Sequence, residues 1–202
     1  DLFKTKLQFG YSNKYELAYR HPNVNKNQTL GLQAAISYSR NHEVAYQTDG
    51  NKILFITDPE QWYIKRFRAS AGLIWRPKLF ITHTFTSEYN QNEVADTIAQ
   101  LNPNFFLNGR RKQRHLSLIY NFSVDRLDIR PYPLQGWRAT FELRQNGFIP
   151  AEDLHLTRIY AEYDRYYKFT PKLSLAIVTA GRMSLPRRRP PYYNNQGLGY
   201  GN

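Results

Sequence analysis

Long stretches of this sequence alternate between apolar and polar residues with a period of two. The clearest stretch is 114–125, where one phase is apolar and the other is polar apart from Ile119. The apolar phase holds Leu116, Leu118, Tyr120, Phe122 and Val124, and the polar phase holds His115, Ser117, Asn121, Ser123 and Asp125. Such alternation predicts β-strands whose two faces meet two different environments.

The same rhythm recurs in about eight segments. They are 5–21, 29–46, 62–76, 79–90, 113–128, 136–146, 154–168 and 172–184. Strands of soluble proteins commonly have about five or six residues, whereas a tilted strand needs about 9 to 11 to cross a bilayer. The lengths therefore predict an all-β fold, a transmembrane antiparallel β-barrel, with these eight strands as part of a larger barrel.

The connections between these segments mostly alternate between short and long. Short turns carry Pro or Asn, as in Arg76-Pro77-Lys78, whereas 47–61, 91–112 and the residues after 185 are longer. Tight turns at one end and long loops at the other are typical of outer-membrane barrels. Val94, Ile98 and Leu101 have helical spacing, with Asn92 placed as a cap, and predict a short helix within 91–112.

The charge of the chain admits two kinds of partner. The formal net charge of +12 and the pI near 9.9 first suggest nucleic acid. The basic clusters, however, lie at strand ends on the long-loop side and lack interleaved aromatic residues for base stacking. We expect no nucleic acid, and we leave open solvated loop charge or contacts with lipopolysaccharide phosphates and acidic barrel residues. The candidate anion contacts are Arg110, Arg111, Arg187, Arg188 and Arg189.

Sequence motifs for catalysis or cofactor binding are absent. There is no cysteine, the five histidines are scattered, and no metal, nucleotide or serine-hydrolase spacing occurs. We therefore expect no cofactor and no metal. His115 and Ser117 share one strand face, which keeps an outer-membrane phospholipase as a less favoured alternative.

The segment 121–137 carries a more specific signal. It reads Asn-Phe-Ser-Val-Asp-Arg-Leu-Asp-Ile-Arg-Pro-Tyr-Pro-Leu-Gln-Gly-Trp. This resembles the strand–turn–strand signature of the BamA and TamA superfamily of outer-membrane protein assembly factors. The matching positions are Asp125, Arg126, Asp128, Pro133 and Gly136, with the arginine one place earlier than in the commonest form. Residues 15–31 resemble a family hairpin, and 190–201 resemble the lead-in to its sixth external loop in Bacteroidota-type members.

The resemblance implies a location, a function and a set of partners. Residues 1–202 would be a partial barrel domain of the bacterial outer membrane, with 185–202 opening a long external loop. The eight segments would be the fourth to eleventh strands of a barrel of about sixteen. Such a protein folds and inserts client barrels, within a BAM-type complex, without catalysing a covalent reaction. Its partners would be outer-membrane lipids and lipopolysaccharide, client barrel proteins and accessory lipoproteins.

Three other classes of protein remain open at this point: a TamA-like or patatin-fused relative, a porin or transporter barrel, and the less favoured outer-membrane phospholipase. A small closed barrel is not expected, because the inward phases hold short polar residues such as Ser37, Ser39, Thr82 and Thr84, which suit a wide, wet lumen. The first and last segments should therefore not pair with each other.

Overall fold

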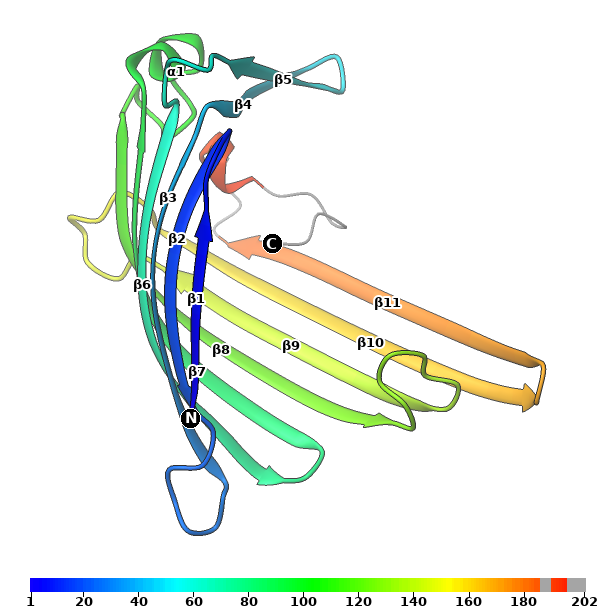
Figure 1. Cartoon of the computed structure of the whole chain (residues 1–202). Helices are drawn as coiled ribbons and strands as arrows, with labels where there is room; N and C mark the ends of the chain where they lie inside the picture. Colours follow the sequence, from blue (N-terminus) through cyan, green and yellow to red (C-terminus); the bar gives the residue numbers. More distant parts are fainter. Residues whose placement is uncertain (186–189, 196–202) are drawn as a thin grey trace.

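The computed structural model describes residues 1–185 and 190–195, and most of them build one curved antiparallel sheet (Figure 1). Its order is β1-β2-β3-β6-β7-β8-β9-β10-β11, so each strand pairs with the next wall strand along the chain. The strands are β1 (Leu2–Gln8), β2 (Ser12–His21), β3 (Leu30–Asn41), β6 (Ile64–Lys78), β7 (Ile81–Val94), β8 (Lys112–Leu127), β9 (Gly136–Asn146), β10 (Leu156–Thr170) and β11 (Leu173–Leu185). This meander confirms the predicted fold class, a section of an antiparallel barrel wall.

The prediction of one strand at 5–21 is wrong, because the chain reverses inside that segment. Strands β1 and β2 pair with each other on either side of Gly10, whose φ is +113°. The Gly10 N–H donates to Asn13 Oδ1 at 3.1 Å and closes the turn. Phe9 and Tyr11 flank this turn and prolong the apolar alternation, which hides the reversal in the sequence. Within residues 1–185 the wall consequently has nine strands rather than eight.

The predicted strand 29–46 also divides, and the long connection after it is not irregular. Its end enters β4 (Glu43–Asp49), which pairs with β5 (Lys52–Thr57) in a separate two-stranded sheet. Gly50 and Asn51 join the two strands with φ of +52° and +60°. Two consecutive positive φ values are typical of tight hairpin turns, in which Gly and Asn are favoured.

The predicted short helix is present as α1 (Asp96–Leu101), but its cap was predicted wrongly. Ala95 occupies the N-cap position, and Asn92 lies within β7, which extends further than expected. Ile98 is buried and Leu101 is 45% exposed, so only part of the predicted apolar stripe is buried.

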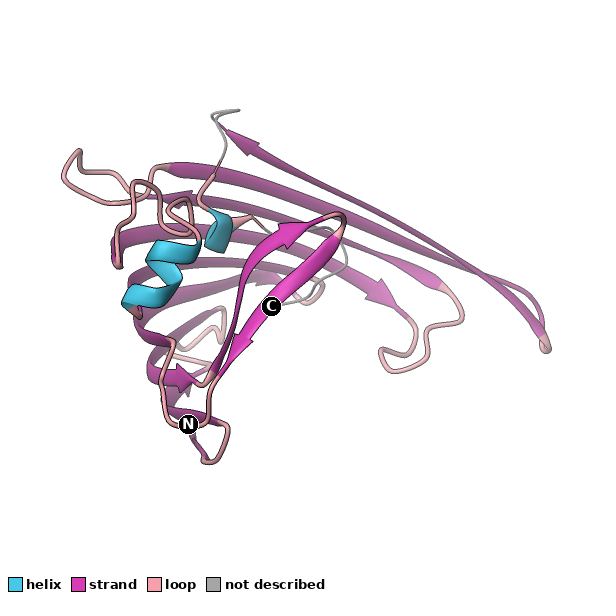
Figure 2. Ribbon diagram, turned by 90° about the horizontal axis from the view of Figure 1, so that it is seen from above, coloured by secondary structure: helices cyan, strands magenta, loops and turns pink. Residues whose placement is uncertain are grey.

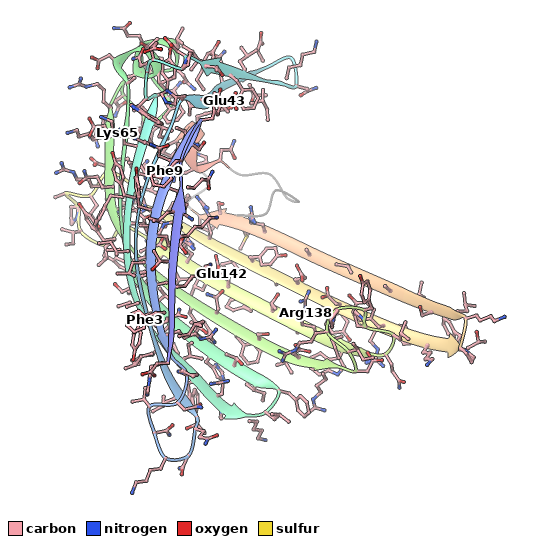
Figure 3. All side chains as sticks on the ribbon, in the orientation of Figure 1. Phe3, Phe9, Glu43, Lys65, Arg138 and Glu142 are labelled. Atoms are coloured by element: carbon pink, nitrogen blue, oxygen red, sulfur yellow. The ribbon has the colours of Figure 1, made fainter. Side chains whose placement is uncertain are left out.

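The two faces of the wall differ in chemistry. On β8, Leu118 is 48% exposed on the outer face, whereas Ser117 is fully buried on the inner face beside Glu88 and Asn146. The residues predicted to face the lumen share this inner face: His115, Asn121, Asp125, Arg138, Glu142 and Arg144. Figure 3 shows Arg138 and Glu142 on the concave side of the sheet.

The two longest connections between wall strands lie at the same end of the wall, together with the tight β1–β2 turn, whose Tyr11 hydroxyl donates to Glu43. The β4–β5 hairpin and α1 are at one end, and the turn between β10 and β11 is at the other (Figure 1). Seen from above, the sheet curves around the side that holds the β4–β5 hairpin (Figure 2). Among the residues that the structure describes, no helix is long and apolar enough to span a membrane.

Strands β1 and β11 form the two edges of the sheet. Strand β1 pairs only with β2, and β11 pairs only with β10, among the described residues. The predicted absence of pairing between the first and last segments is therefore confirmed, and the sheet is open rather than a closed small barrel.

An arginine on the outer face should be costly, because hydrocarbon cannot solvate it. We expect Leu118→Arg, near the middle of β8, to lower the free energy of unfolding of the full-length barrel in lipid by about 2–4 kcal/mol. Urea unfolding in bilayers measures this change. The matched control, Asn121→Arg, places the same side chain on the inner face of the same strand and should cost much less. Equal stability of Leu118→Arg and the parent protein would contradict a membrane-facing outer surface.

Candidate functional site on the inner wall and its loop cap

Ion pairs join neighbouring strands on the inner face. Arg138 on β9 donates from Nε to Asp164 Oδ2 at 2.8 Å and from Nη2 to Glu162 Oε1 at 3.0 Å. The register creates the first pair, because Arg138 lies directly opposite Asp164. Asp164 is 1% exposed, and a carboxylate buried to this degree requires a cation that also donates hydrogen bonds.

A second ion pair spans three strands. Arg144 on β9 reaches across β8 to Glu88 on β7, with 3.2 Å between Nη1 and Oε1. The β8 residue opposite Glu88 is Ser117, whose short side chain leaves room for the arginine. The inner wall is therefore a cross-linked, charged surface that suits a water-filled interior.

The main apolar cluster of the described residues lies in the long connections and at the adjoining ends of β6 and β7. Its buried members are Val44, Tyr63, Ile64, Val94, Ile98, Phe105 and Phe106. Phe105 and Phe106 are each 1% exposed, and their rings meet edge to face with centroids 4.9 Å apart. Burial of these side chains holds the connections in one arrangement. We call β4, β5, α1 and the connection 102–111 the loop cap.

Residues 190–195 are docked against this loop cap. They include the single 3-10 turn η1 (Tyr192–Asn194), which lies inside the curve of the wall (Figure 2). The Tyr193 N–H donates to the Phe105 carbonyl at 3.2 Å, and its ring packs against Phe105 and Phe106. The Tyr193 hydroxyl accepts from Arg66 Nε at 3.1 Å and donates to Asn92 Oδ1 at 3.3 Å.

Asn194 ties the same segment to the inner wall. Its Oδ1 accepts from Gln113 Nε2, and its carbonyl accepts from Arg158 Nη2, both at 2.9 Å. Gln113 belongs to β8 and is fully buried, whereas Arg158 belongs to β10. The docked segment therefore joins the loop cap to two strands of the wall.

Two carboxylates accept hydrogen bonds from the backbone of β8 where this strand extends beyond the end of β9. Glu152 Oε1 accepts from the Leu116 N–H at 2.5 Å, and Asp153 Oδ2 accepts from the Arg114 N–H at 2.8 Å. Glu152 Oε2 also accepts from the N–H of Ile149 at 2.9 Å. Desolvation acts to raise the pKa of Glu152, but these backbone donors lower it below its ordinary value. Backbone groups that lack a neighbouring strand are thus satisfied by side chains.

The motif residues between β8 and β9 build a tight turn. Asp128 Oδ1 accepts from the N–H of Ile129 at 2.9 Å and of Leu134 at 3.1 Å. Desolvation acts to raise the pKa of Asp128, but these donors hold it below its usual value. Pro133 is half-buried within the turn. Gly136 has φ of +114°, and a Cβ at this position would lie 2.2 Å from the Arg126 carbonyl oxygen.

The two remaining motif residues stabilise the outer parts of this turn. Asp125 pairs with Arg130 at 2.9 Å. The Arg126 guanidinium lies 5.7 Å from the centre of the Phe80 ring and 5.9 Å from that of Trp137. These contacts are typical of a structural hairpin, and the five motif residues do not converge on a ligand-binding cavity.

The sequence model of the Omp85 superfamily domain matches residues 2–192. The chain belongs to the Omp85 superfamily. This confirms the resemblance of the chain to the BamA and TamA superfamily. Comparison with the curated proteins gives no match.

A solved Omp85-type barrel has the same fold. The crystal structure of BamA from Haemophilus ducreyi lacking POTRA domains 1–3 superposes with a TM-score of 0.66 at 13% sequence identity. The match covers 93% of this Omp85 chain and 37% of that chain, so this chain spans well under half the length of the BamA structure.

The basic residues of this Omp85 chain that were predicted to contact anions lie on the loop side, with carboxylates nearby. Arg110 Nη1 lies 2.8 Å from Asp153 Oδ1, and Arg111 Nη1 lies 2.6 Å from Asp96 Oδ1. Both arginines are at least half exposed. Arg187, Arg188 and Arg189 lie outside the described residues.

The serine and histidine of the phospholipase alternative do not form a catalytic pair. Ser117 Oγ donates to Asn146 Oδ1 at 2.8 Å, and His115 Nδ1 is buried without a hydrogen-bond partner in the described part of the chain. A serine activated by histidine needs a hydrogen bond between the two side chains.

Replacing Gly136 tests whether its conformation and its close packing both matter. We expect Gly136→Ala to destabilise the full-length barrel by about 3 kcal/mol or more, because strain at positive φ adds to a backbone clash. Gly10→Ala is the matched control, since Gly10 has nearly the same φ, +113°, but no atom within 4 Å of a Cβ. Thermal unfolding in detergent compares the two variants. Equal losses at the two positions would show that the clash at Gly136 has no effect.

Removing the Tyr193 ring should release the docked segment. We expect hydrogen exchange at the amides of Tyr192 and Tyr193 to rise by roughly tenfold in Tyr193→Ala, because the partly buried ring contributes a fraction of the roughly 1.5–3 kcal/mol of full burial. Tyr193→Phe keeps the ring and should have a smaller effect. Tyr132→Ala is the control, since Tyr132 is 83% exposed at the opposite end. Unchanged exchange in Tyr193→Ala would show that the ring does not hold the segment.

Proposed function

We propose that this chain is part of the barrel of an outer-membrane protein assembly factor, which folds and inserts client β-barrels into the bacterial outer membrane. The observation that carries the proposal is an Omp85 wall whose outer face is apolar and whose inner face is charged and holds the docked segment 190–195. The partners that follow are outer-membrane lipids and lipopolysaccharide, client barrels, and accessory lipoproteins of an assembly complex.

The physical task of such a factor is to satisfy the backbone of an incoming strand. A client strand in hydrocarbon leaves N–H and C=O groups unpaired, at a cost of several kcal/mol each. An edge strand can offer these groups a template by adding the client to its sheet. We infer that β1 and β11 continue into further wall strands and that the section described here forms the rear of the barrel. It would set the curvature of the barrel and anchor the start of a long external loop.

Three other functions remain as alternatives to the assembly factor. A TamA-like or patatin-fused relative would have the same wall, and the 13% identity with BamA does not separate these members. A porin or transporter would also have a polar inner face. The contacts of Asn194 with Gln113 and Arg158 favour an assembly factor over an open pore, because they place a loop segment against the inner wall.

Client folding in defined membranes tests the proposal. Proteoliposomes containing the full-length protein should fold a urea-denatured small barrel at least about tenfold faster than empty liposomes, equivalent to lowering the barrier by about 1.4 kcal/mol. The appearance of the heat-modifiable folded band gives the rate.

The control for this assay is a porin reconstituted at the same protein-to-lipid ratio, which disturbs the bilayer without templating strands. Folding no faster than with the porin would contradict the proposal. A large steady ion conductance in that case would favour the porin alternative.

A further inference from the structure

We propose that the outer face of the wall binds a phosphate-bearing lipid of the outer leaflet. Its phosphate would lie at Arg114, beside Lys112, and an acyl chain would fill an apolar hollow between β3 and β8. The proposal rests on the membrane placement in the proposed function, and it goes further by assigning a lipid site away from both sheet edges.

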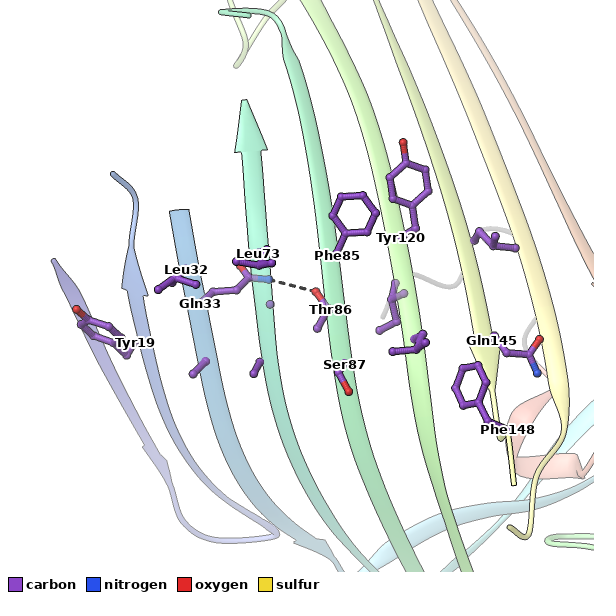
Figure 4. A pocket seen from close by; sticks show the side chains of 16 residues that line it. Tyr19, Leu32, Gln33, Leu73, Phe85, Thr86, Ser87, Tyr120, Gln145 and Phe148 are labelled. Atoms are coloured by element: carbon purple, nitrogen blue, oxygen red, sulfur yellow. Dashed lines mark hydrogen bonds between the residues drawn. The ribbon is translucent and has the colours of Figure 1, made fainter. Parts of the chain in front are cut away.

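A hollow of about 840 Å³ opens on the outer face (Figure 4). Small side chains on three neighbouring strands form its floor, because Ala34, Ala71 and Ser87 lie opposite one another in the register. On the inner side, Gln33 donates to Thr86 over Gly72, which has no side chain, so the wall is thin at this point. The hollow is thus a consequence of residue size in one row of the sheet.

Large apolar side chains border this floor. The adjacent row consists of Leu32, Leu73, Phe85, Tyr120 and Leu143, which lie in register on five neighbouring strands. Ala71 is in the middle of β6, so the floor lies at the level of the hydrocarbon core of a spanning wall. A hollow lined by apolar groups at that depth fits an acyl chain, because the chain packs against the large border side chains without exposing polar groups to hydrocarbon.

A second, basic hollow lies at the loop end of the same face. It has a volume of about 370 Å³ and is lined by Arg110, Arg111, Lys112, Arg114 and Asp153. Lys112 and Arg114 belong to the same outward phase of β8 as Leu116 and Leu118. Their charges therefore lie on the membrane-facing side, at the level of lipid headgroups.

Arg114 is the cation best placed to hold a phosphate. The other three cations already have carboxylate partners: Arg110 with Asp153, Arg111 with Asp96 and Lys112 with Glu93, at 2.8, 2.6 and 3.4 Å. The Arg114 side chain has no such partner in the described part of the chain, and it is exposed. A guanidinium can bind phosphate through two parallel hydrogen bonds.

The two hollows are close enough for one amphipathic molecule. Both border β8 and the connection 147–153, since Phe148 lines the apolar hollow and Asp153 lines the basic one. Arg114 and Leu118 are four residues apart on β8, or about 13 Å along the strand. A free phosphate would use only the basic hollow, whereas a lipid with a phosphate headgroup uses both.

Native mass spectrometry of the full-length protein in detergent tests the site. The probes are a diphosphorylated lipid A, a phosphatidylcholine and inorganic phosphate. We expect lipid A to bind roughly three- to tenfold more tightly than phosphatidylcholine, as expected for one or two exposed charge contacts. The double variant Lys112→Gln/Arg114→Gln should abolish this preference. Ala71→Phe should fill the hollow and weaken the binding of both lipids severalfold.

Two control variants should change nothing. Lys172→Gln removes a charge at the opposite end of the wall, and Ala161→Phe adds a ring to the outer face of β10, outside the hollow. The proposal is overturned if lipid A shows no preference, if the preference survives Lys112→Gln/Arg114→Gln, or if Ala71→Phe and Ala161→Phe behave alike. Inorganic phosphate that binds as tightly as lipid A would also overturn it.

Client folding is measured on the same preparations, so the two proposals can fail separately. Lipid A selectivity without client folding contradicts the assembly function and supports the lipid site. Client folding without lipid selectivity contradicts the lipid site alone.

Discussion

Backbone hydrogen bonding without water is the constraint on which the rest of this structure depends. A wall in hydrocarbon must pair each strand with its neighbours, and the unbroken ladder from β1 to β11 does so. The irregular connections lie beyond the ends of the strands, where water can meet their backbone groups (Figure 1). Strand β8 extends beyond the end of β9. There the carboxylates of Glu152 and Asp153 accept hydrogen bonds from the β8 backbone N–H groups, as carbonyl groups of a neighbouring strand would. In the Omp85 wall, backbone groups are therefore paired both within the strands and at this strand end.

Most of the fold could be predicted from the sequence, because a membrane wall imposes a period of two that few other structures produce over such lengths. Strands β6 to β11 follow the predicted segments closely. The errors occurred where a turn preserves that period. At Phe9-Gly10-Tyr11 a single glycine reverses the chain between two aromatic residues, so the reversal resembles a continued strand. At Gly50-Asn51 the turn chemistry is visible in the sequence, but the length of 47–61 predicts a loop rather than a hairpin.

Less of the candidate site could be predicted. Alternation placed Arg138 on the inner face, but its pairing with Asp164 depends on the register between two strands, which composition does not determine. The docking of Tyr193 against Phe105 joins residues far apart in the chain and could not be inferred from spacing. One sequence feature does indicate a buried cluster in this connection, since Phe105 and Phe106 are adjacent large apolar residues among polar ones. The turn within 121–137 could be predicted, because the residues that build it are close together in the sequence.

The loop cap and the wall differ in the temperature dependence of their stability, because their apolar side chains leave different environments on folding. The apolar side chains on the outer face of the wall face hydrocarbon, whereas Phe105, Phe106, Ile98 and their neighbours are removed from water. Only the second kind of burial carries the large heat-capacity change of apolar hydration. The cap therefore follows the curved temperature dependence of a small soluble domain, while the stability of the wall follows the state of the bilayer. Order in the external loops and order in the membrane should accordingly respond differently to temperature and to lipid composition.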